Sequence, residues 1–264
     1  MNLTAEHICY TYPKEKAPVL RDISFEVAEG DVTVIIGANG TGKTTLLKCL
    51  LGYLKGGGIT RIGGRDRREY SDRRLSDTVG YMTQEGALMS GLSVLDVVLL
   101  GRLGTLNLRV QDEDVEKAAS ILRMLHLESL AARPFYALSG GQRRMVDAAQ
   151  TLVRDPSVLI MDEPTANLDL IHELQVLELV KEYTHQKKTA TLLTLHDLNM
   201  ASRFADRLVL LKDGTVYRMG TPAEVITEEH IREAYGVQVR VTEGSEGRPV
   251  MQVIAPAVTA GYHF

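Results

Sequence analysis

The sequence lacks any long, uninterrupted apolar run. The richest apolar stretch, residues 94–100, contains Asp96 and is far shorter than the roughly 20 residues that a helix needs to span a bilayer. The first residues contain no basic region followed by an apolar segment, so we expect no secretion signal. Any work at a membrane is therefore expected to depend on a partner chain.

Cysteine and surplus positive charge are also scarce. The two cysteines, Cys9 and Cys49, form no CxxC or metal-ligand spacing, which favours a reduced, cytosolic protein. With 30 Lys and Arg against 34 Asp and Glu, the net charge is −4, so no overall basic field favours nucleic acid as a partner.

The sequence shows no internal repeats. A chain of 264 residues can bury one α/β core with one inserted subdomain, and we expect a single domain over 1–264.

The clearest motif is a glycine-rich loop between an apolar run, 32–36, and a helical pattern that follows it. Residues 37–44 fit the pattern G-x-x-x-x-G-K-[ST], which binds nucleotide phosphates. Glycines let the backbone turn tightly, so that its N–H groups meet phosphate oxygens at the start of a helix. The residues expected to bind nucleotide here are Gly37, Ala38, Asn39, Gly40, Thr41, Gly42, Lys43, Thr44 and Thr45.

Within this loop, two side chains have specific expected roles. Lys43 is expected to reach the β- and γ-phosphates of ATP, and the Thr44 hydroxyl to coordinate the Mg²⁺ that bridges them. The alternative is a simple turn with a solvated lysine. We favour the phosphate loop because the whole pattern is present between a strand and a helix.

A second candidate element is the acidic end of the apolar strand 158–161. Asp162 and Glu163 follow directly, where open α/β sheets bind ligands. Asp162 suits a place at Mg²⁺, and Glu163 suits a base or orienter for an attacking water. The pair could instead be a helix N-cap and a first-turn acid. The phosphate loop upstream favours the catalytic interpretation.

The segment 138–142, Leu-Ser-Gly-Gly-Gln, predicts a second anion-binding helix start. Its members Ser139, Gly140, Gly141 and Gln142 would offer an N-cap hydroxyl and bare backbone N–H groups. One phosphate does not need two such helix ends from one chain. The natural use is in trans, against nucleotide held by another copy.

In this order, the three segments resemble the landmarks of the ATP-binding cassette (ABC) ATPases, with 138–142 as the signature. The resemblance, together with the alternation of strands and helices, predicts an α/β fold: a P-loop NTPase (RecA-like) core with an antiparallel β subdomain at residues 1–30 and an inserted α-helical subdomain at 85–156. We expect Gly56 to Gly58 to break the first helix, a hairpin at 212–214, and a last strand or a mobile tail at 251–254.

The resemblance also implies roles for further residues. Tyr12 resembles the aromatic that stacks on adenine, although Tyr10 is close by. Gln84 resembles the glutamine that touches Mg²⁺ and the attacking water. His196 resembles the histidine that hydrogen-bonds the γ-phosphate; a lone histidine at a strand end is otherwise an ordinary surface or core residue. Residues 166–169 resemble the D-loop, which crosses to the partner protomer.

Departures from the family pattern are modest. Ala38 stands where proline is common, and Thr44 where serine is common. Residues 143–150 lack the usual arginine placement after the signature, which bears on helix packing. Residues 165–167 replace the commoner serine-containing D-loop and bear on communication between the two sites.

Three classes of ABC protein compete. A repair ATPase would carry a long heptad insertion, and a translation factor would carry two cassettes; the sequence has neither. The third class, a transporter subunit, needs only a single cassette.

Segments 92–102, 131–141, 196–201 and 220–227 resemble the ATPases of bacterial importers for iron-siderophore, haem and vitamin B12. The resemblance implies an ATP- and Mg²⁺-dependent homodimer that sandwiches nucleotide. The protein would lie peripherally at the cytoplasmic face of the plasma (inner) membrane. There, the region 84–109 would contact integral-membrane permease subunits. A substrate-binding protein would meet this chain only indirectly, through the permease. Another importer, or an exporter, is the alternative.

Overall fold

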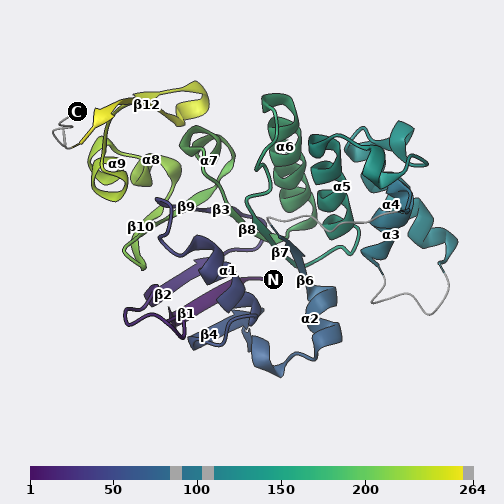
Figure 1. The fold of residues 1–264 in the computed structure, drawn as a ribbon, viewed down its shortest axis with the longest axis horizontal. Helices are drawn as coiled ribbons and strands as arrows, with labels where there is room; N and C mark the ends of the chain where they lie inside the picture. Colours follow the sequence, from purple (N-terminus) through teal and green to yellow (C-terminus); the bar gives the residue numbers. More distant parts are fainter. Residues whose placement is uncertain (84–90, 103–109, 258–264) are drawn as a thin grey trace.

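The computed structural model describes residues 1–83, 91–102 and 110–257, and three sheets organise them (Figure 1). The strands are β1 (Leu3–Tyr10), β2 (Leu20–Val27), β3 (Val32–Ile36), β4 (Gly57–Ile62), β5 (Arg65–Asp66), β6 (Val79–Met82), β7 (Val158–Asp162), β8 (Ala190–Thr194), β9 (Arg207–Lys212), β10 (Thr215–Gly220), β11 (Val237–Glu243) and β12 (Pro249–Pro256). The α-helices are α1 (Lys43–Leu51), α2 (Asp72–Thr78), α3 (Val94–Leu100), α4 (Asp112–Met124), α5 (Gly140–Leu152), α6 (Leu170–Lys187), α7 (Leu198–Phe204), α8 (Pro222–Val225) and α9 (Glu228–Tyr235). The elements follow the expected α/β order.

The central sheet has six strands in the order β10-β9-β3-β8-β7-β6, and only β10 runs antiparallel to its neighbour. Helix α1 and the antiparallel sheet cover one face, while α5, α6 and α7 cover the other. Every residue of β3, β7 and β8 is buried, as expected for parallel strands covered on both sides. In β3, Val34 and Ile36 face α5 to α7, and Ile35 faces α1.

The antiparallel sheet, in the order β2-β1-β4-β5, packs over α1 and agrees with the expected strands in residues 1–30. The end of α1 differs from expectation. The helix stops at Leu51, and Gly52 takes a left-handed conformation (φ 77°) that returns its N–H to the Cys49 carbonyl. Gly52 therefore ends the helix before Gly56 to Gly58, because a glycine just past the last turn adopts positive φ without strain.

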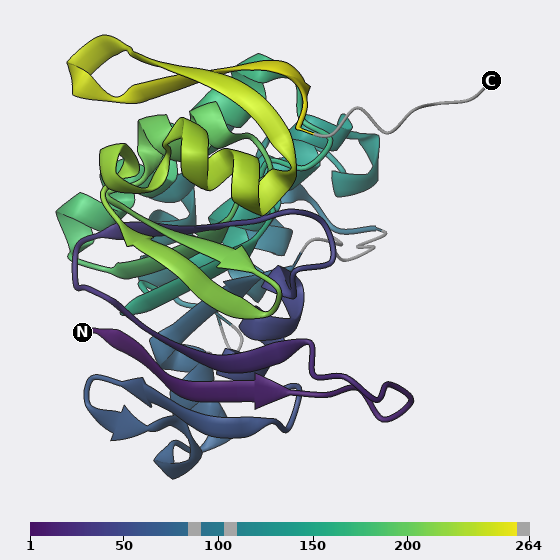
Figure 2. The ribbon, with the colours of Figure 1, turned by 90° about the vertical axis from the view of Figure 1, so that its left-hand side faces the viewer.

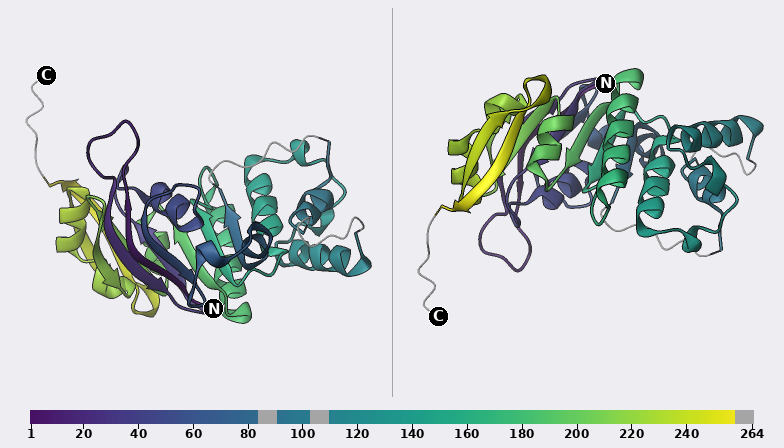
Figure 3. Two further views of the ribbon diagram at one scale, coloured as in Figure 1. Left: turned by 90° about the horizontal axis from the view of Figure 1, so that it is seen from below. Right: turned by 90° about the horizontal axis from the view of Figure 1, so that it is seen from above.

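Helices α3, α4 and α5 are inserted between β6 and β7 and form a lobe at one end of the molecule (Figure 3). Together with the core sheet they confirm the predicted fold class. The bounds 85–156 of the insertion stay a prediction, since 84–90 and 103–109 lie outside the described residues. In the described ranges, no helix combines the length and apolar character needed to cross a bilayer.

At the other end, β11 and β12 form a hairpin that packs on α7 and α9 (Figure 2). The side-chain amide of Asn199 in α7 donates to the Met251 carbonyl at 3.1 Å and accepts from the Met251 N–H at 2.8 Å. The Ser202 hydroxyl donates to the Pro249 carbonyl at 2.6 Å. The segment 251–254 is therefore a strand, one of the two outcomes that the sequence left open.

One buried polar atom at the centre of the sheet gives a stability prediction. The Thr33 hydroxyl in β3 is fully buried and has no hydrogen-bond partner among the described residues. Thr33→Val should raise the free energy of unfolding by about 1 kcal/mol, because it removes an unpaired polar group and keeps the shape. Urea unfolding checks this.

The matched control is Thr191→Val in β8. The Thr191 hydroxyl is also buried but lies 2.6 Å from the Thr184 hydroxyl, so its removal should destabilise the fold. Equal losses of stability in the two variants would contradict the prediction.

Candidate functional site

The glycine-rich loop joins the end of β3 to the start of α1 at the carboxyl edge of the central sheet. A Cβ built on Gly37 would lie 2.6 Å from the Leu211 carbonyl oxygen and 2.9 Å from Thr41 Oγ1, so only glycine fits there. Burial raises the pKa of Tyr235, at the end of α9, and the Gly37 backbone acts against that shift. Helix α1 has no side-chain N-cap, and its first N–H groups stay available to an anion.

Lys43 is buried at the first position of α1. Its ammonium donates to the carbonyl oxygens of Gly37 at 2.7 Å and Ala38 at 3.2 Å, which holds it along the loop. Burial lowers the pKa of Lys43, and the nearby carboxylates of Glu163 and Asp162 act against that shift. The loop thus carries a positive charge within the field of the acidic pair.

Asp162 ends β7, and its carboxylate is almost completely buried. The hydroxyl of Thr194, at the end of the neighbouring strand β8, donates to Asp162 Oδ1 at 2.7 Å and accepts from the Glu163 N–H at 2.8 Å. Glu163 adopts φ 50°, a strained conformation for a residue with a side chain. No helix begins here; α6 starts at Leu170, so the N-cap interpretation of the acidic pair is wrong.

The Glu163 carboxylate pairs with the His196 imidazole. Oε1 of Glu163 lies 2.5 Å from Nε2 of His196, which follows β8 by two residues. The His196 side chain is 51% exposed and that of Glu163 only 10%, so the pair reaches from the buried sheet edge to solvent. Sequence reasoning missed Thr194, whose hydroxyl contacts Asp162 Oδ1 and the Glu163 N–H and so orients the acidic pair. Its only sequence signal was a polar residue ending an apolar run.

Lys43, Glu163 and His196 line one open pocket of about 470 Å³. Its lining residues include Tyr12, Gly40, Gly42, Lys43, Thr44, Thr45, Glu163 and His196. The Tyr12 hydroxyl lies 3.1 Å from Thr45 Oγ1, and the Tyr10 ring packs edge-on against Tyr12 at a centroid distance of 4.9 Å. Of the two tyrosines, Tyr12 lines the pocket and Tyr10 supports it from behind.

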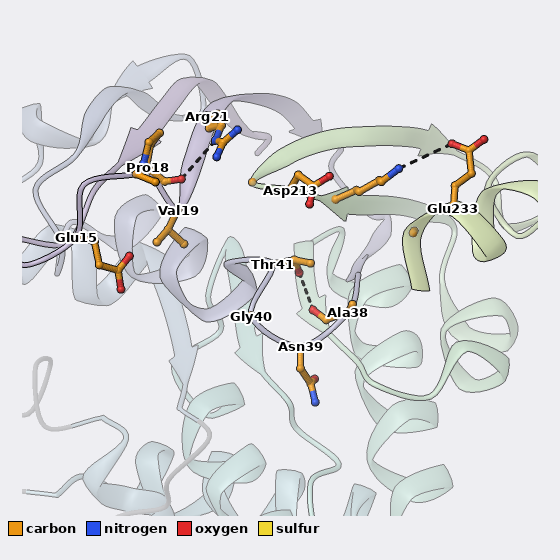
Figure 4. A pocket seen from close by; sticks show the side chains of 14 residues that line it. Glu15, Pro18, Val19, Arg21, Ala38, Asn39, Gly40, Thr41, Asp213 and Glu233 are labelled. Carbon is orange, nitrogen blue, oxygen red and sulfur yellow. Dashed lines mark hydrogen bonds and ion pairs between the residues drawn. The ribbon is translucent and has the colours of Figure 1, made fainter. Parts of the chain in front are cut away.

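A second groove, of about 630 Å³, lies along the outer side of the same loop (Figure 4). The Thr41 hydroxyl donates to the Ala38 carbonyl at 2.8 Å and shapes the loop there. Glu15, Val19, Asn39 and Gly40 line both hollows, so the two adjoin at the loop. Only the smaller pocket contains the lysine, the carboxylate and the histidine together.

The segment expected to act on another copy's nucleotide opens α5. Ser139 is the N-cap: its hydroxyl accepts from the Gln142 N–H at 3.2 Å, and the Gln142 side chain accepts from the Ser139 N–H at 3.1 Å. Gly140 is exposed and Gly141 half-buried. None of these four residues lines the pocket around Lys43, so within one chain the structure does not bring the two anion-binding helix starts together.

Comparison with known proteins identifies the family. The family model described as ABC transporter matches residues 20–166, which is more than half of the chain. The chain belongs to the ABC transporter ATPases.

Relatives extend the likeness over nearly the whole chain. An uncharacterized ABC transporter ATP-binding protein of Methanocaldococcus jannaschii is 38% identical, covering 95% of this chain and 97% of the relative. A hemin import ATP-binding protein of Burkholderia thailandensis is 35% identical, covering 97% and 100%.

Solved structures agree. A metal-chelate type ABC transporter in an inward-facing conformation has a TM-score of 0.80 at 26% identity, covering 96% of each chain. A dimeric bacterial ABC transporter cassette has a TM-score of 0.74 at 26% identity, covering 83% of this chain and 98% of the other. This ABC ATPase therefore has the cassette fold and the ATPase activity of its family.

The remaining predicted residues have different outcomes. Gln84 lies outside the described residues. For Mg²⁺, the described chain offers the Thr44 hydroxyl and the Asp162 carboxylate near the loop, a hard-oxygen set that fits an ion completed by phosphate and water. Within 1–83, 91–102 and 110–257, no cluster of three or more His, Cys, Asp or Glu forms a separate metal site.

A residue that sequence reasoning linked only to helix packing connects the insertion to the acidic pair. The buried guanidinium of Arg144, on the first turns of α5, donates to four backbone carbonyls among the described residues. Its acceptors are Thr83 at 2.7 Å, Asp162 at 3.2 Å, Glu163 at 2.8 Å and Pro164 at 3.1 Å. Arg144 thus holds the backbone that carries Glu163 and the residue before Gln84.

Replacing this arginine should affect both stability and catalysis. Arg144→Met leaves several buried carbonyls unpaired, so we expect a loss of about 3 kcal/mol in unfolding free energy and a lower kcat, with ATP affinity retained. Urea unfolding, nucleotide titration and steady-state ATPase kinetics measure the three quantities.

Arg123→Met is the control, because Arg123 is exposed on α4. It should match the wild type in all three measurements. A normal kcat in Arg144→Met would show that the Glu163 backbone keeps its place without the guanidinium.

Proposed function

We propose that this chain is the ATP-hydrolysing subunit of an importer for a metal chelate, such as an iron-siderophore complex, haem or cobalamin. It works as a homodimer that encloses two ATP molecules. Each nucleotide lies between the Lys43 loop of one copy and the Ser139 to Gly141 helix start of the other. ATP-driven closure of the two copies supplies the mechanical work on a membrane partner.

One observation carries the dimer. The pocket unites Lys43, Glu163 and His196 from three separate segments, while the second anion-binding helix start of the same chain opens elsewhere. The carboxyl edge of a parallel sheet is a ligand site, yet its open side here has no cover from the same chain's α5. A second copy supplies that cover, which agrees with the dimeric cassette of the same fold.

The geometry supports specific roles in hydrolysis. The Lys43 ammonium, held by two loop carbonyls, can turn to the β- and γ-phosphates that the α1 N–H groups bind. Glu163 lines the pocket from its buried side, and its carboxylate orients or deprotonates the attacking water. His196 contacts that carboxylate at 2.5 Å and holds it towards the γ-phosphate position.

Thr44 and Asp162 would hold Mg²⁺, together with Gln84. Bound there, Mg²⁺ would neutralise charge that develops on the phosphate oxygens. Asp162 is prepared for this role because Thr194 donates to one of its oxygens and fixes the direction of the other. The chain's part in catalysis is thus mainly positioning and charge stabilisation.

The transport assignment rests on likeness. The hemin import relative and the metal-chelate type transporter each match nearly the whole chain. We propose that integral-membrane permease subunits dock at the insertion and place the chain at the cytoplasmic face of the membrane. A groove of about 340 Å³ between core and insertion, lined by Tyr53, Tyr81, Gly101 and Arg154, supports this because both parts of the chain contribute to it. A substrate-binding protein would meet only the permease.

Glu163→Gln tests the sandwich. The variant should bind ATP yet hydrolyse it at least about 100-fold more slowly, because the amide cannot accept the proton of water. With saturating Mg-ATP it should elute as a dimer in size-exclusion chromatography, and with ADP as a monomer. Monomeric elution with Mg-ATP would count heavily against the sandwich.

Uptake of siderophores and haem that carry radioactive iron, and of cobalamin that carries radioactive cobalt, tests the transport assignment. Cells that lack this gene should lose uptake of one of these metal chelates, and the wild-type gene should restore it. Lys43→Ala should not restore uptake, because the loop loses the charge that binds the β- and γ-phosphates. Unchanged uptake of siderophore iron, haem and cobalamin in the deleted strain would favour another importer or an exporter.

A further inference from the structure

The side chain of His172, near the start of α6, has two contacts: a hydrogen bond to Asp169 and ring packing against Gly141. Asp169 is the N-cap of α6, and its Oδ1 atom accepts two hydrogen bonds from His172, from the backbone N–H at 3.0 Å and from Nδ1 at 2.6 Å. The first bond is the ordinary capping bond. The second adds nothing that the cap needs, but it fixes the direction of the imidazole ring.

That ring packs against the signature helix. A Cβ built on Gly141 would lie 3.1 Å from both Cγ and Nδ1 of His172, tighter than an ordinary contact. Gly141 lies within helix α5, so its backbone conformation does not require glycine. The close approach of the His172 ring favours glycine instead, because the ring would have to shift by a few tenths of an ångström to admit a Cβ. By contrast, a Cβ on the neighbouring Gly140 would meet nothing within 4 Å.

The two contacts connect segments from different parts of the chain. Gly141 belongs to the helix start that opens α5 in the insertion, and Asp169 closes the loop that follows β7 in the core. The chain between them folds as α5 and β7. Next to this junction, Leu170 and Ile171 form an apolar pair on the first turn of α6, each 63% exposed. An exposed apolar pair beside the signature suits a face that a second copy covers.

We propose that His172 is a positioning residue that holds the start of α5 and the loop 166–169 as one unit, so that both meet the other copy together. The inference rests on the proposed nucleotide sandwich. His172 lines no part of the Lys43 pocket, so it acts on the partner's site and not on its own. ATP binding to a single copy should therefore not depend on it.

Three substitutions separate the two contacts. His172→Ala removes both, His172→Phe keeps a ring against Gly141 without the N–H, and His172→Asn keeps a donor towards Asp169 without the ring. His185→Ala is the matched control, because His185 lies on the same helix and pairs with Asp206 at 3.1 Å, away from α5.

The measurement is dimerisation of each variant in the Glu163→Gln background, as a function of protein concentration with saturating Mg-ATP. Loss of coupling between contacting groups predicts that His172→Ala raises the concentration for half-maximal dimer by about tenfold. In a protein that is otherwise wild type, His172→Ala should lower the ATPase rate per molecule at low protein concentration, and the ATP affinity of the monomer should be unchanged. His172→Phe and His172→Asn should each fall between His172→Ala and the parent, and His185→Ala should match the parent.

The outcomes separate this inference from the proposed function. If Glu163→Gln itself never dimerises with Mg-ATP, the sandwich fails and the inference with it. If Glu163→Gln dimerises and adding His172→Ala leaves the concentration dependence unchanged, only the role of His172 is overturned. Should His172→Ala fail to fold, His172→Phe and His172→Asn decide, because parent-like dimerisation in both would equally overturn it.

Discussion

The parallel register of β3, β8 and β7 is the constraint on which the site depends. Thr194 stands beside Ile35 of β3 on one side and beside Asp162 of β7 on the other. A slip of one residue would turn every side chain of β8 to the opposite face, and both faces of this sheet are buried. The burial of apolar side chains thus fixes the register, and the register brings the phosphate loop, the acidic pair and His196 to one edge.

The strain at Glu163 is maintained by the same packing. A positive φ at a non-glycine residue costs on the order of 1–3 kcal/mol and persists only where the surroundings determine it. Here the Glu163 N–H is bound by Thr194 Oγ1, and its carbonyl is bound by Arg144. One partner belongs to the sheet and the other to the insertion. The direction of the Glu163 carboxylate therefore depends on how the insertion sits on the core.

The sequence predicted features whose cause is local. The phosphate loop, the strand before Asp162, the Ser139 cap and the hairpin at 212–214 each follow from neighbouring residues, and the family resemblance supplied Tyr12 and His196. Contacts across long sequence distances were missed. Arg144 appeared as a departure in helix packing because the carbonyls of Thr83, Asp162, Glu163 and Pro164 lie in segments that only the folded chain brings near α5. The early end of α1 at Gly52 was missed because two glycine positions competed, and the first of them already met the capping requirement.

Arg144 and His172 connect the same two parts of the chain in physically different ways. Arg144 is buried and binds backbone carbonyls, so breaking its bonds leaves several polar groups unpaired. The His172 side chain is 26% exposed and relies on one carboxylate and one van der Waals contact. The first connection is costly to disrupt and keeps Glu163 in place within each copy. The second lies at the surface beside the signature, where the approach of another copy in the proposed dimer would change its surroundings. Under the proposed sandwich, the cassette would hold Glu163 rigidly while it adjusts to a partner, and the two connections differ in the way that these two demands require.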